Sequence, residues 1–330
     1  MILVTGANGF LGSKLIKELL EKGEKIRAFV RPDSNLELID SFLPKIELFE
    51  GNILDITDLQ NAFIGIEYIY HCAAVISFSK NERQNMFKTN VEGTANLVNI
   101  ALEFPIKKII YISSISAIGA NPLKGEIDES LNWEKHNYNS EYGLSKQLAE
   151  REIMRGVSEG LNANIVNPGI ILGEGLWHKN TGRIWSNIWN EQRFSFKGGN
   201  GFVDINDVVT FTLKAMSDGI NGERYILVCE NIDYQQLLSK IADSLGKKRP
   251  AFYAPKLLQK FYVFVDGIKC LITNNPRKLT LEHVKITDIK FSYKNKKAIK
   301  EFGINFTPLN NTIERISKSF LKTKTENKNG

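Results

Sequence analysis

The chain has 330 residues, of which 42% are hydrophobic and 24% charged, a composition typical of a globular protein with one large or two smaller domains. Its net charge of +6 comes from the C-terminal end, because ten basic residues stand against three acidic ones from Lys290 onward. This end lacks the ordered spacing of a nucleic-acid-binding surface. We therefore expect no nucleic-acid partner and a disordered basic tail over about residues 317–330.

Cysteine usage and apolar runs bear on the compartment. Cys72, Cys229 and Cys270 are far apart and form no C-x-x-C pair, which favours a reducing environment. The first apolar run starts at residue 2 with no charged leader before it, and no run reaches the ~20 apolar residues of a membrane span. The four histidines show no metal-ligand spacing. We expect a cytoplasmic protein with no transmembrane segment and no metal site.

Short apolar runs alternate with amphipathic helical patterns through the first half of the chain. Strands are predicted at residues 2–6, 25–30, 46–51, 68–74, 108–114 and 162–169. Helices are predicted at 12–23, 58–65, 90–104 and 142–160. This alternation predicts an α/β fold, a doubly wound parallel sheet of the Rossmann type, over residues 1–166.

The regular alternation ends after Pro168. Residues 202–230 resemble a return to the sheet, and the rest of 167–330 is expected to form a smaller substrate-binding cap. The segment 176–201 holds Trp177, Trp185 and Trp189, which would cover an apolar substrate pocket or form the core of the cap itself. Residues 256–272 form an apolar stretch interrupted by Asp266 and Lys269. We interpret it as a core or substrate-lining helix, with attachment to a membrane surface as the alternative.

The glycine-rich stretch TGANGFLG follows the first strand and opens the first helix. Gly6, Gly9 and Gly12 allow a sharp turn, a close approach of the backbone to a pyrophosphate, and close packing of helix on strand. The unpaired N–H groups at the helix start then face the anion. Glycines needed only for a tight turn are the alternative, and the strand–turn–helix context favours a dinucleotide site.

The end of the second strand bears on the choice of cofactor. A site for NAD usually places an acidic residue there for the adenine ribose, whereas arginine accommodates the 2′-phosphate of NADP. Arg31 holds this position in AFVRPDSN. The sequence therefore favours NADP over NAD, and an ordinary exposed arginine is the alternative.

Tyr142 and Lys146 stand four residues apart on a predicted helix, so both side chains lie on one face. A phenol with an ordinary pKa of about 10 needs a neighbouring positive charge before it can act as a base at neutral pH. Such a pair also occurs by chance. Its interpretation as a catalytic pair depends on other motifs.

Those motifs occur in a fixed order. After TGANGFLG come HCAA at 71–74, TNVEGTANL at 89–97, YISS at 111–114, YGLSK at 142–146, NPG at 167–169 and FVDINDV at 202–208. In this order the chain resembles the extended short-chain dehydrogenases/reductases of the NAD-dependent epimerase/dehydratase superfamily, most closely the branch of dihydroflavonol reductases and 3β-hydroxysteroid dehydrogenases. The resemblance covers roughly residues 2–230.

The resemblance implies roles for individual residues. Tyr142 would be the general acid/base, Lys146 would lower its pKa and hold the nicotinamide ribose, and Ser114 would orient the substrate oxygen, with Ser113 and Ser116 as neighbours that could exchange that role. Asn90 would steady the catalytic helix, or serve as an N-cap. The implied cofactor-binding residues are Thr5, Gly6, Asn8, Gly9, Phe10, Leu11, Gly12, Arg31, Asn52, Ile53, Cys72, Ala73, Ala74, Asn90, Tyr142, Lys146, Pro168 and Gly169.

Two positions depart from the family pattern. Asn52 stands where an aspartate usually contacts the adenine amino group, and its amide oxygen can accept the same hydrogen bond. The stretch YISSISAIG lacks the Thr-Asp-Glu run of the dehydratases, which argues against a sugar 4,6-dehydratase.

The sequence leaves the reaction open. A reductase of a ketone or aldehyde, working in either direction, is favoured by Arg31. A nucleotide-sugar 4-epimerase with tightly held NAD is the alternative, since Arg183 and Arg193 could bind a diphosphate. A cofactor-sensing protein without catalysis would have no need for Ser114, Tyr142 and Lys146 together. By analogy with the family we expect a small-molecule substrate and a homodimer.

Overall fold

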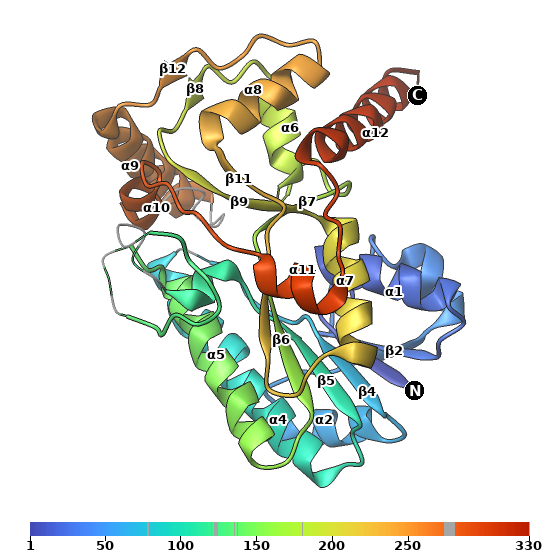
Figure 1. The fold of residues 1–330 in the computed structure, drawn as a ribbon. Helices are drawn as coiled ribbons and strands as arrows, with labels where there is room; N and C mark the ends of the chain where they lie inside the picture. Colours follow the sequence, from blue (N-terminus) through green and yellow to red (C-terminus); the bar gives the residue numbers. More distant parts are fainter. Residues whose placement is uncertain are drawn as a thin grey trace.

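The computed structural model describes residues 1–77, 79–119, 121, 125–134, 136, 138–179, 181–273 and 281–329. Within them, seven parallel strands form one sheet in the order β10-β6-β5-β4-β1-β2-β3 (Figure 1). Their bounds are β1 (Ile2–Thr5), β2 (Ile26–Val30), β3 (Glu47–Glu50), β4 (Tyr68–His71), β5 (Lys108–Ile112), β6 (Ala163–Pro168) and β10 (Arg224–Leu227). The predicted Rossmann-type sheet is confirmed.

Helices cover both faces of this sheet. On one face lie α1 (Phe10–Glu21), α7 (Ile205–Asp218) and α11 (Lys296–Phe302), and on the other α2 (Ile56–Phe63), α4 (Gly93–Glu103) and α5 (Glu141–Ser158). Side chains along β1 point alternately to the two faces of the sheet. Ile2 and Val4 are buried in the core on the α1 side, and Leu3 is buried in the core on the α2 side. The strands are apolar on both sides for this reason.

The strand order places a crevice at the carboxyl ends of β1 and β4. The chain runs outward from β1 through β2 to β3, and then crosses to β4 on the other side of β1. Loops leaving β1 and β4 therefore diverge, which is the point where open α/β sheets bind ligands. Short helical segments follow here, namely η2 (Lys80–Glu82), α3 (Arg83–Phe87), the π-helix η3 (Lys88–Glu92) and, after β5, η4 (Ile115–Ile118). Segment η1 (Asp40–Lys45) precedes β3.

A smaller cap lies at one end of the sheet (Figure 1). Its strands are β7 (Ile170–Leu172), β9 (Gly199–Asp204) and β11 (Glu230–Asp233) in one sheet, and β8 (Phe194–Ser195) paired with β12 (Phe252–Tyr253). Its helices are α6 (Gly182–Trp189), α8 (Tyr234–Ser244), α9 (Lys256–Thr273), α10 (Leu281–Ile286) and α12 (Leu309–Asn329). No helix in the described part of the chain is long and apolar enough to cross a bilayer.

The expected return to the main sheet over 202–230 is divided between the two parts. Strand β10 and helix α7 belong to the Rossmann part, whereas β9 pairs with β7 and β11 in the cap. Helix α11 also returns, because Ala298 and Phe302 are buried in the core beneath α7. Its short KKAIKEF pattern gave no indication of this from sequence.

The C-terminal segment differs from the prediction of a disordered tail beginning at about residue 317. Helix α12 continues to Asn329, and Phe320 is fully buried. The rings of Trp177 and Trp189 pack edge-on against Phe320, at 5.1 and 5.8 Å between centroids, and Trp185 Nε1 donates to Ser317 Oγ at 2.8 Å. These contacts hold the helix in place. They also place the tryptophans in the core of the cap, as the alternative interpretation had it.

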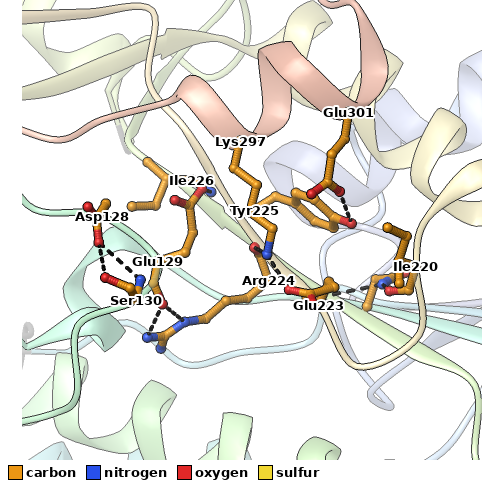
Figure 2. A network of polar contacts seen from close by, with 11 residues as sticks. Asp128, Glu129, Ser130, Ile220, Glu223, Arg224, Tyr225, Ile226, Lys297 and Glu301 are labelled. Carbon is orange, nitrogen blue, oxygen red and sulfur yellow. Dashed lines mark hydrogen bonds and ion pairs between the residues drawn. The ribbon is translucent and has the colours of Figure 1, made fainter.

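A polar network fixes the edge strand β10 (Figure 2). Glu129 Oε1 accepts the Ile226 N–H at 2.9 Å, and the Arg224 guanidinium donates to the Glu129 carbonyl oxygen. On α11, Lys297 pairs with Glu223, and Glu301 accepts from Tyr225 Oη. The loop after η4 and helix α11 thereby cover an edge that would otherwise expose unpaired backbone groups.

Candidate active site

The glycine loop after β1 is shaped to receive an anion. Gly6 has φ +63°, and a Cβ at this position would lie 2.7 Å from the Ala73 nitrogen. A Cβ on Gly12 would collide with the Gly6 carbonyl, so α1 packs directly on the loop. Gly9 is the N-cap of α1 and provides no side-chain hydrogen bond, and the first turn holds no acidic residue. The free N–H groups at this helix start suit a phosphate.

A cavity of about 580 Å³ opens beside this loop. It is lined by Asn8, Gly9, Phe10, Arg31, Pro32, Asp33, Ser34, Asn35, Leu38, Leu176 and Lys179. The lining contains two cations, Arg31 and Lys179, and one carboxylate, Asp33. Lys179 comes from the cap, so sequence spacing alone could not place it beside Arg31. This donor set and the glycine cradle fit the phosphates of a dinucleotide.

Several predicted cofactor residues take other structural roles. Thr5 Oγ1 is buried and bonded to His71 and the Ala73 N–H. The side chains of Leu11 and Ile53 are buried in the two cores of the Rossmann part. Asn52 Oδ1 accepts the Leu54 N–H at 3.0 Å, so the oxygen expected to contact adenine already closes a local turn.

The remaining predicted cofactor residues line the crevice side of the sheet. Cys72, Ala73 and Ala74 follow β4, and the Cys72 N–H donates to the Thr5 carbonyl. Burial raises the pKa of the Cys72 thiol to about 12, so it carries no thiolate at neutral pH. Pro168 ends β6, and the Gly169 N–H donates to the Leu227 carbonyl.

The start of α5 lies directly on the segment after β5. A Cβ on Gly143 would lie 2.5 Å from the Ser116 carbonyl oxygen, so only glycine permits this approach. Ser140 caps the helix by accepting the Gly143 N–H. Tyr142 is thereby brought near Ser114, whose hydroxyl acts to lower the Tyr142 pKa against the larger effect of burial. Among Ser113, Ser114 and Ser116, this arrangement favours Ser114 as the partner of Tyr142.

The neighbouring Ser113 points elsewhere and supports the backbone. Its hydroxyl donates to Glu150, which is buried one turn beyond Lys146 on α5. Asn167 Nδ2 donates both to Glu150 and to the Ser114 carbonyl oxygen, and Arg224 lies 3.5 Å from Glu150. Burial raises the Glu150 pKa. The cluster fixes the position of the Ser114 backbone from beneath.

Lys146 is buried and turned toward β5. Its Nζ donates to the Ile112 carbonyl oxygen at 2.7 Å and lies 4.2 Å from the centre of the Tyr111 ring. Burial lowers the Lys146 pKa to about 7 and raises the Tyr142 pKa to about 12. The expected lowering of the Tyr142 pKa by Lys146 is thus absent here, because the ammonium group is bonded to the backbone and only the Ser114 hydroxyl opposes the effect of burial.

Asn90 lies inside the π-helix η3 and joins the site to the loop after β4. Its side chain exchanges hydrogen bonds with the backbone of Val75, at 2.7 and 2.9 Å. Its amide also donates to Ser145 Oγ at 2.9 Å, and Ser145 donates to the Tyr142 carbonyl. The N-cap interpretation is wrong, since the residue is in the middle of a helical run. π-Helical turns often occur at functional sites, where they redirect a side chain.

His71, the first residue of the HCAA motif, is fully buried, and its role could not be predicted from the sequence. Thr5 Oγ1 lies 2.7 Å from its Nδ1, and Thr94 Oγ1 lies 3.0 Å from its Nε2. Thr94 in turn donates to the Asn90 carbonyl. The imidazole therefore joins the glycine loop to the helix that carries Asn90. Burial lowers its pKa to about 3, which keeps it neutral.

We predict that this neutral histidine makes the protein less stable as the pH falls below about 6.5, the value for an unfolded chain. The unfolded chain binds a proton there, whereas folded His71 binds it only near a pH of about 3. The unfolding free energy should fall by up to about 1.4 kcal/mol per pH unit from this group. Urea unfolding between pH of about 4 and 7 measures the slope. His71→Gln should reduce it, and an equal slope in both proteins would contradict the assignment.

Known proteins resemble this chain over most of its length. A sequence model of the NAD dependent epimerase/dehydratase family matches residues 2–227. Sterol demethylase protein B of Methylococcus capsulatus is 32% identical over 272 residues, 81% of each chain. Anthocyanidin reductase of Arabidopsis thaliana is 27% identical over 330 residues, covering 92% of this chain and 90% of its own. UDP-glucose 4-epimerase of Thermotoga maritima shares the fold, with a TM-score of 0.79 at 21% identity over 98% and 99% of the chains.

Proposed function

Because the chain belongs to the NAD dependent epimerase/dehydratase family and is an extended short-chain dehydrogenase/reductase, we propose that it reduces a ketone or aldehyde, or oxidises the corresponding alcohol. The observation that carries the proposal is the contact between Ser114 and Tyr142 on the helix that also holds Lys146. A hydroxyl that can orient an oxygen and a phenol that can move a proton are the groups that carbonyl reduction needs.

Each residue of the site has a distinct part. Ser114 holds the substrate oxygen, and Tyr142 delivers or removes the proton at that oxygen. Lys146 supplies positive charge and holds a ribose hydroxyl, and Asn90 keeps Ser145 and the Tyr142 backbone in place. A bound nicotinamide would supply or accept the hydride. The phosphates would lie against the glycine loop, where the N–H groups of α1 are free of side-chain caps.

We propose NADP as the preferred cofactor. Arg31 and Lys179 are two cations that line the cavity beside the glycine loop. A 2′-phosphate on the adenine ribose would carry the negative charge to pair with both. Asp33 in the same cavity favours the opposite choice, because a carboxylate binds the ribose hydroxyls of NAD. The two cations outweigh it in charge.

Reversing either charge tests this preference. Arg31→Glu and Lys179→Glu should each weaken NADPH binding by about 10- to 100-fold, since each removes a charged hydrogen bond to phosphate, and should leave NADH binding nearly unchanged. Lys45→Glu makes the same change of charge on an exposed residue outside the cavity and is the control. Equal losses for NADPH and NADH would show that neither residue reads the 2′-phosphate.

The substrate class is proposed from two sources. The two relatives above are named for sterol demethylation and anthocyanidin reduction, and both names point to substrates built on several rings. We therefore test NADPH oxidation with 3-ketosteroids, dihydroflavonols and aromatic aldehydes. Turnover with one of these classes supports a reductase, whereas no turnover with any of them and conversion of a UDP-hexose to its 4-epimer would establish the epimerase. Cofactor binding without either reaction would favour a sensor.

Two further expectations complete the proposal. We expect a homodimer formed through α4 and α5, by analogy with the family, and light scattering on the purified protein tests it. We also expect a cytoplasmic location, because the cysteines lack disulfide spacing. Cell fractionation tests this second point.

A further inference from the structure

The outward face of α9 is apolar, and its inward face carries a buried polar side chain. Leu257, Phe261 and Phe264 follow one another at helical spacing and are 81%, 61% and 65% exposed. Gln259 on the opposite face is buried, donates to the Ala254 carbonyl and accepts from Thr287 Oγ1. Val263 is buried on the same inward face, so α9 is apolar on both sides, whereas a surface helix normally has a polar outer face. This arrangement indicates that the outer stripe meets something other than water.

The strand pair beside α9 continues the apolar surface. Phe194 on β8 and Phe252 on β12 are exposed, with 6.2 Å between their ring centroids. Tyr253 is also exposed, and β12 leads into α9 after two residues. Figure 1 shows β8 and β12 at the top of the cap and α9 along its left side. We call the exposed side chains of Phe252, Tyr253, Leu257, Phe261, Phe264 and Val265 the α9 face.

Basic residues surround the α9 face. Exposed Lys256 and Lys260 lie on α9, and exposed Arg193, Lys197 and Lys248 lie in the segments beside β8 and before β12. Lys256 is paired with Asp288 at 3.5 Å. Lys197 Nζ lies 6.0 Å from the centre of the Tyr253 ring. Within the part of α9 whose side chains are described, residues 256–266, Asp266 is the single acidic residue. The rim therefore carries a clear excess of positive charge.

This charge decides among possible occupants. A second copy placed on the α9 face by two-fold symmetry would bring one basic rim against another, which costs free energy. An anionic phospholipid surface is complementary to it, because apolar and aromatic side chains enter the interface while lysine and arginine side chains attract the headgroups. Since no described helix can span a bilayer, α9 would lie in the plane of the membrane.

We propose that the α9 face docks the cap onto the surface of a bilayer that contains anionic phospholipid. The proposal uses no residue of the catalytic or cofactor site and stands independently of the proposed function. An apolar stripe gives affinity by burial, and the basic rim makes that affinity depend on anionic lipid and on salt.

Sedimentation with vesicles tests the proposal. The full-length protein should sediment with vesicles of phosphatidylglycerol and phosphatidylcholine in equal parts, much less with phosphatidylcholine alone, and less as salt is added. Leu257→Gln with Phe261→Gln should lower the affinity by more than about tenfold, because two apolar side chains no longer leave water on binding. Lys197→Glu with Lys260→Glu should remove the preference for phosphatidylglycerol.

The control makes the same change on the Rossmann part. Ile64→Gln with Ile220→Gln replaces two side chains that are 61% and 57% exposed and should bind vesicles as the unsubstituted protein does. Since all these side chains are exposed, thermal unfolding should change little. Absence of sedimentation, or equal sedimentation of the Leu257 and Phe261 double variant, would overturn the proposal. So would loss of a dimer in that variant, because the face would then be covered by a second copy.

Discussion

Replacing Tyr142 by phenylalanine is expected to lower the rate of carbonyl reduction by about 10²- to 10⁴-fold, the usual contribution of a general acid/base. The hydroxyl is the only group removed, and the ring keeps its place at the start of α5. NADPH affinity should therefore change by less than about tenfold. Fluorescence titration gives the affinity, and NADPH oxidation with an accepted carbonyl substrate gives the rate.

A fully buried tyrosine outside the site, Tyr225, serves as the control for this loss. Tyr225 Oη donates to Glu301 in the network at the far edge of the sheet, so Tyr225→Phe also removes one buried hydroxyl. It should keep full turnover. Turnover of Tyr142→Phe within about tenfold of the unsubstituted rate would remove this phenol from the proton-transfer step.

Replacing Lys146 by methionine is expected to reduce both turnover and cofactor affinity, each by about tenfold or more, because a charged hydrogen bond to the ribose is lost. It should also change how stability depends on pH. Burial lowers the Lys146 pKa to about 7, so between pH of about 7 and 10.5 the unfolded chain binds a proton that the folded chain does not. In this window the unsubstituted protein, free of cofactor, should gain stability as pH rises, and Lys146→Met should lose that gain.

Lys108 offers a matched control for the loss of cofactor affinity. It is also a buried lysine with a lowered pKa, and its Nζ donates to the Gly219 carbonyl at 2.7 Å, outside the site. Lys108→Met should leave NADPH affinity unchanged. If the two variants lose cofactor affinity equally, Lys146 contributes to the fold and has no specific part in binding.

Much of the fold could be predicted because local pattern and tertiary position agree in the first half of the chain. The runs ILVT, IRAFV and KIIYI become buried parallel strands. The glycine turn has a positive φ at Gly6, a conformation that favours glycine. The resemblance to extended short-chain dehydrogenases/reductases is confirmed by the family match. The motif order carried that prediction, since neither composition nor net charge distinguishes this class.

The second half was less predictable because its packing depends on contacts distant in sequence. Helix α12 is held by tryptophans about 130 to 150 positions earlier, so its basic, polar sequence resembled a disordered tail. Lys179 reaches the Arg31 cavity from the cap in the same way. The low-polarity surroundings of Lys146 and Tyr142 likewise reverse the expected direction of the phenol pKa. Such effects arise from burial, which spacing along the chain does not reveal.

The most direct test of the account is to measure the nicotinamide cofactor in the purified protein and then titrate the protein with NADPH and NADH by nicotinamide fluorescence. A reductase that exchanges its cofactor at each turnover should be isolated without retained NAD. It should also bind NADPH more tightly, because Arg31 and Lys179 would hold the 2′-phosphate under the proposed assignment. Tightly retained NAD, or a preference for NADH, would contradict the account and favour the epimerase.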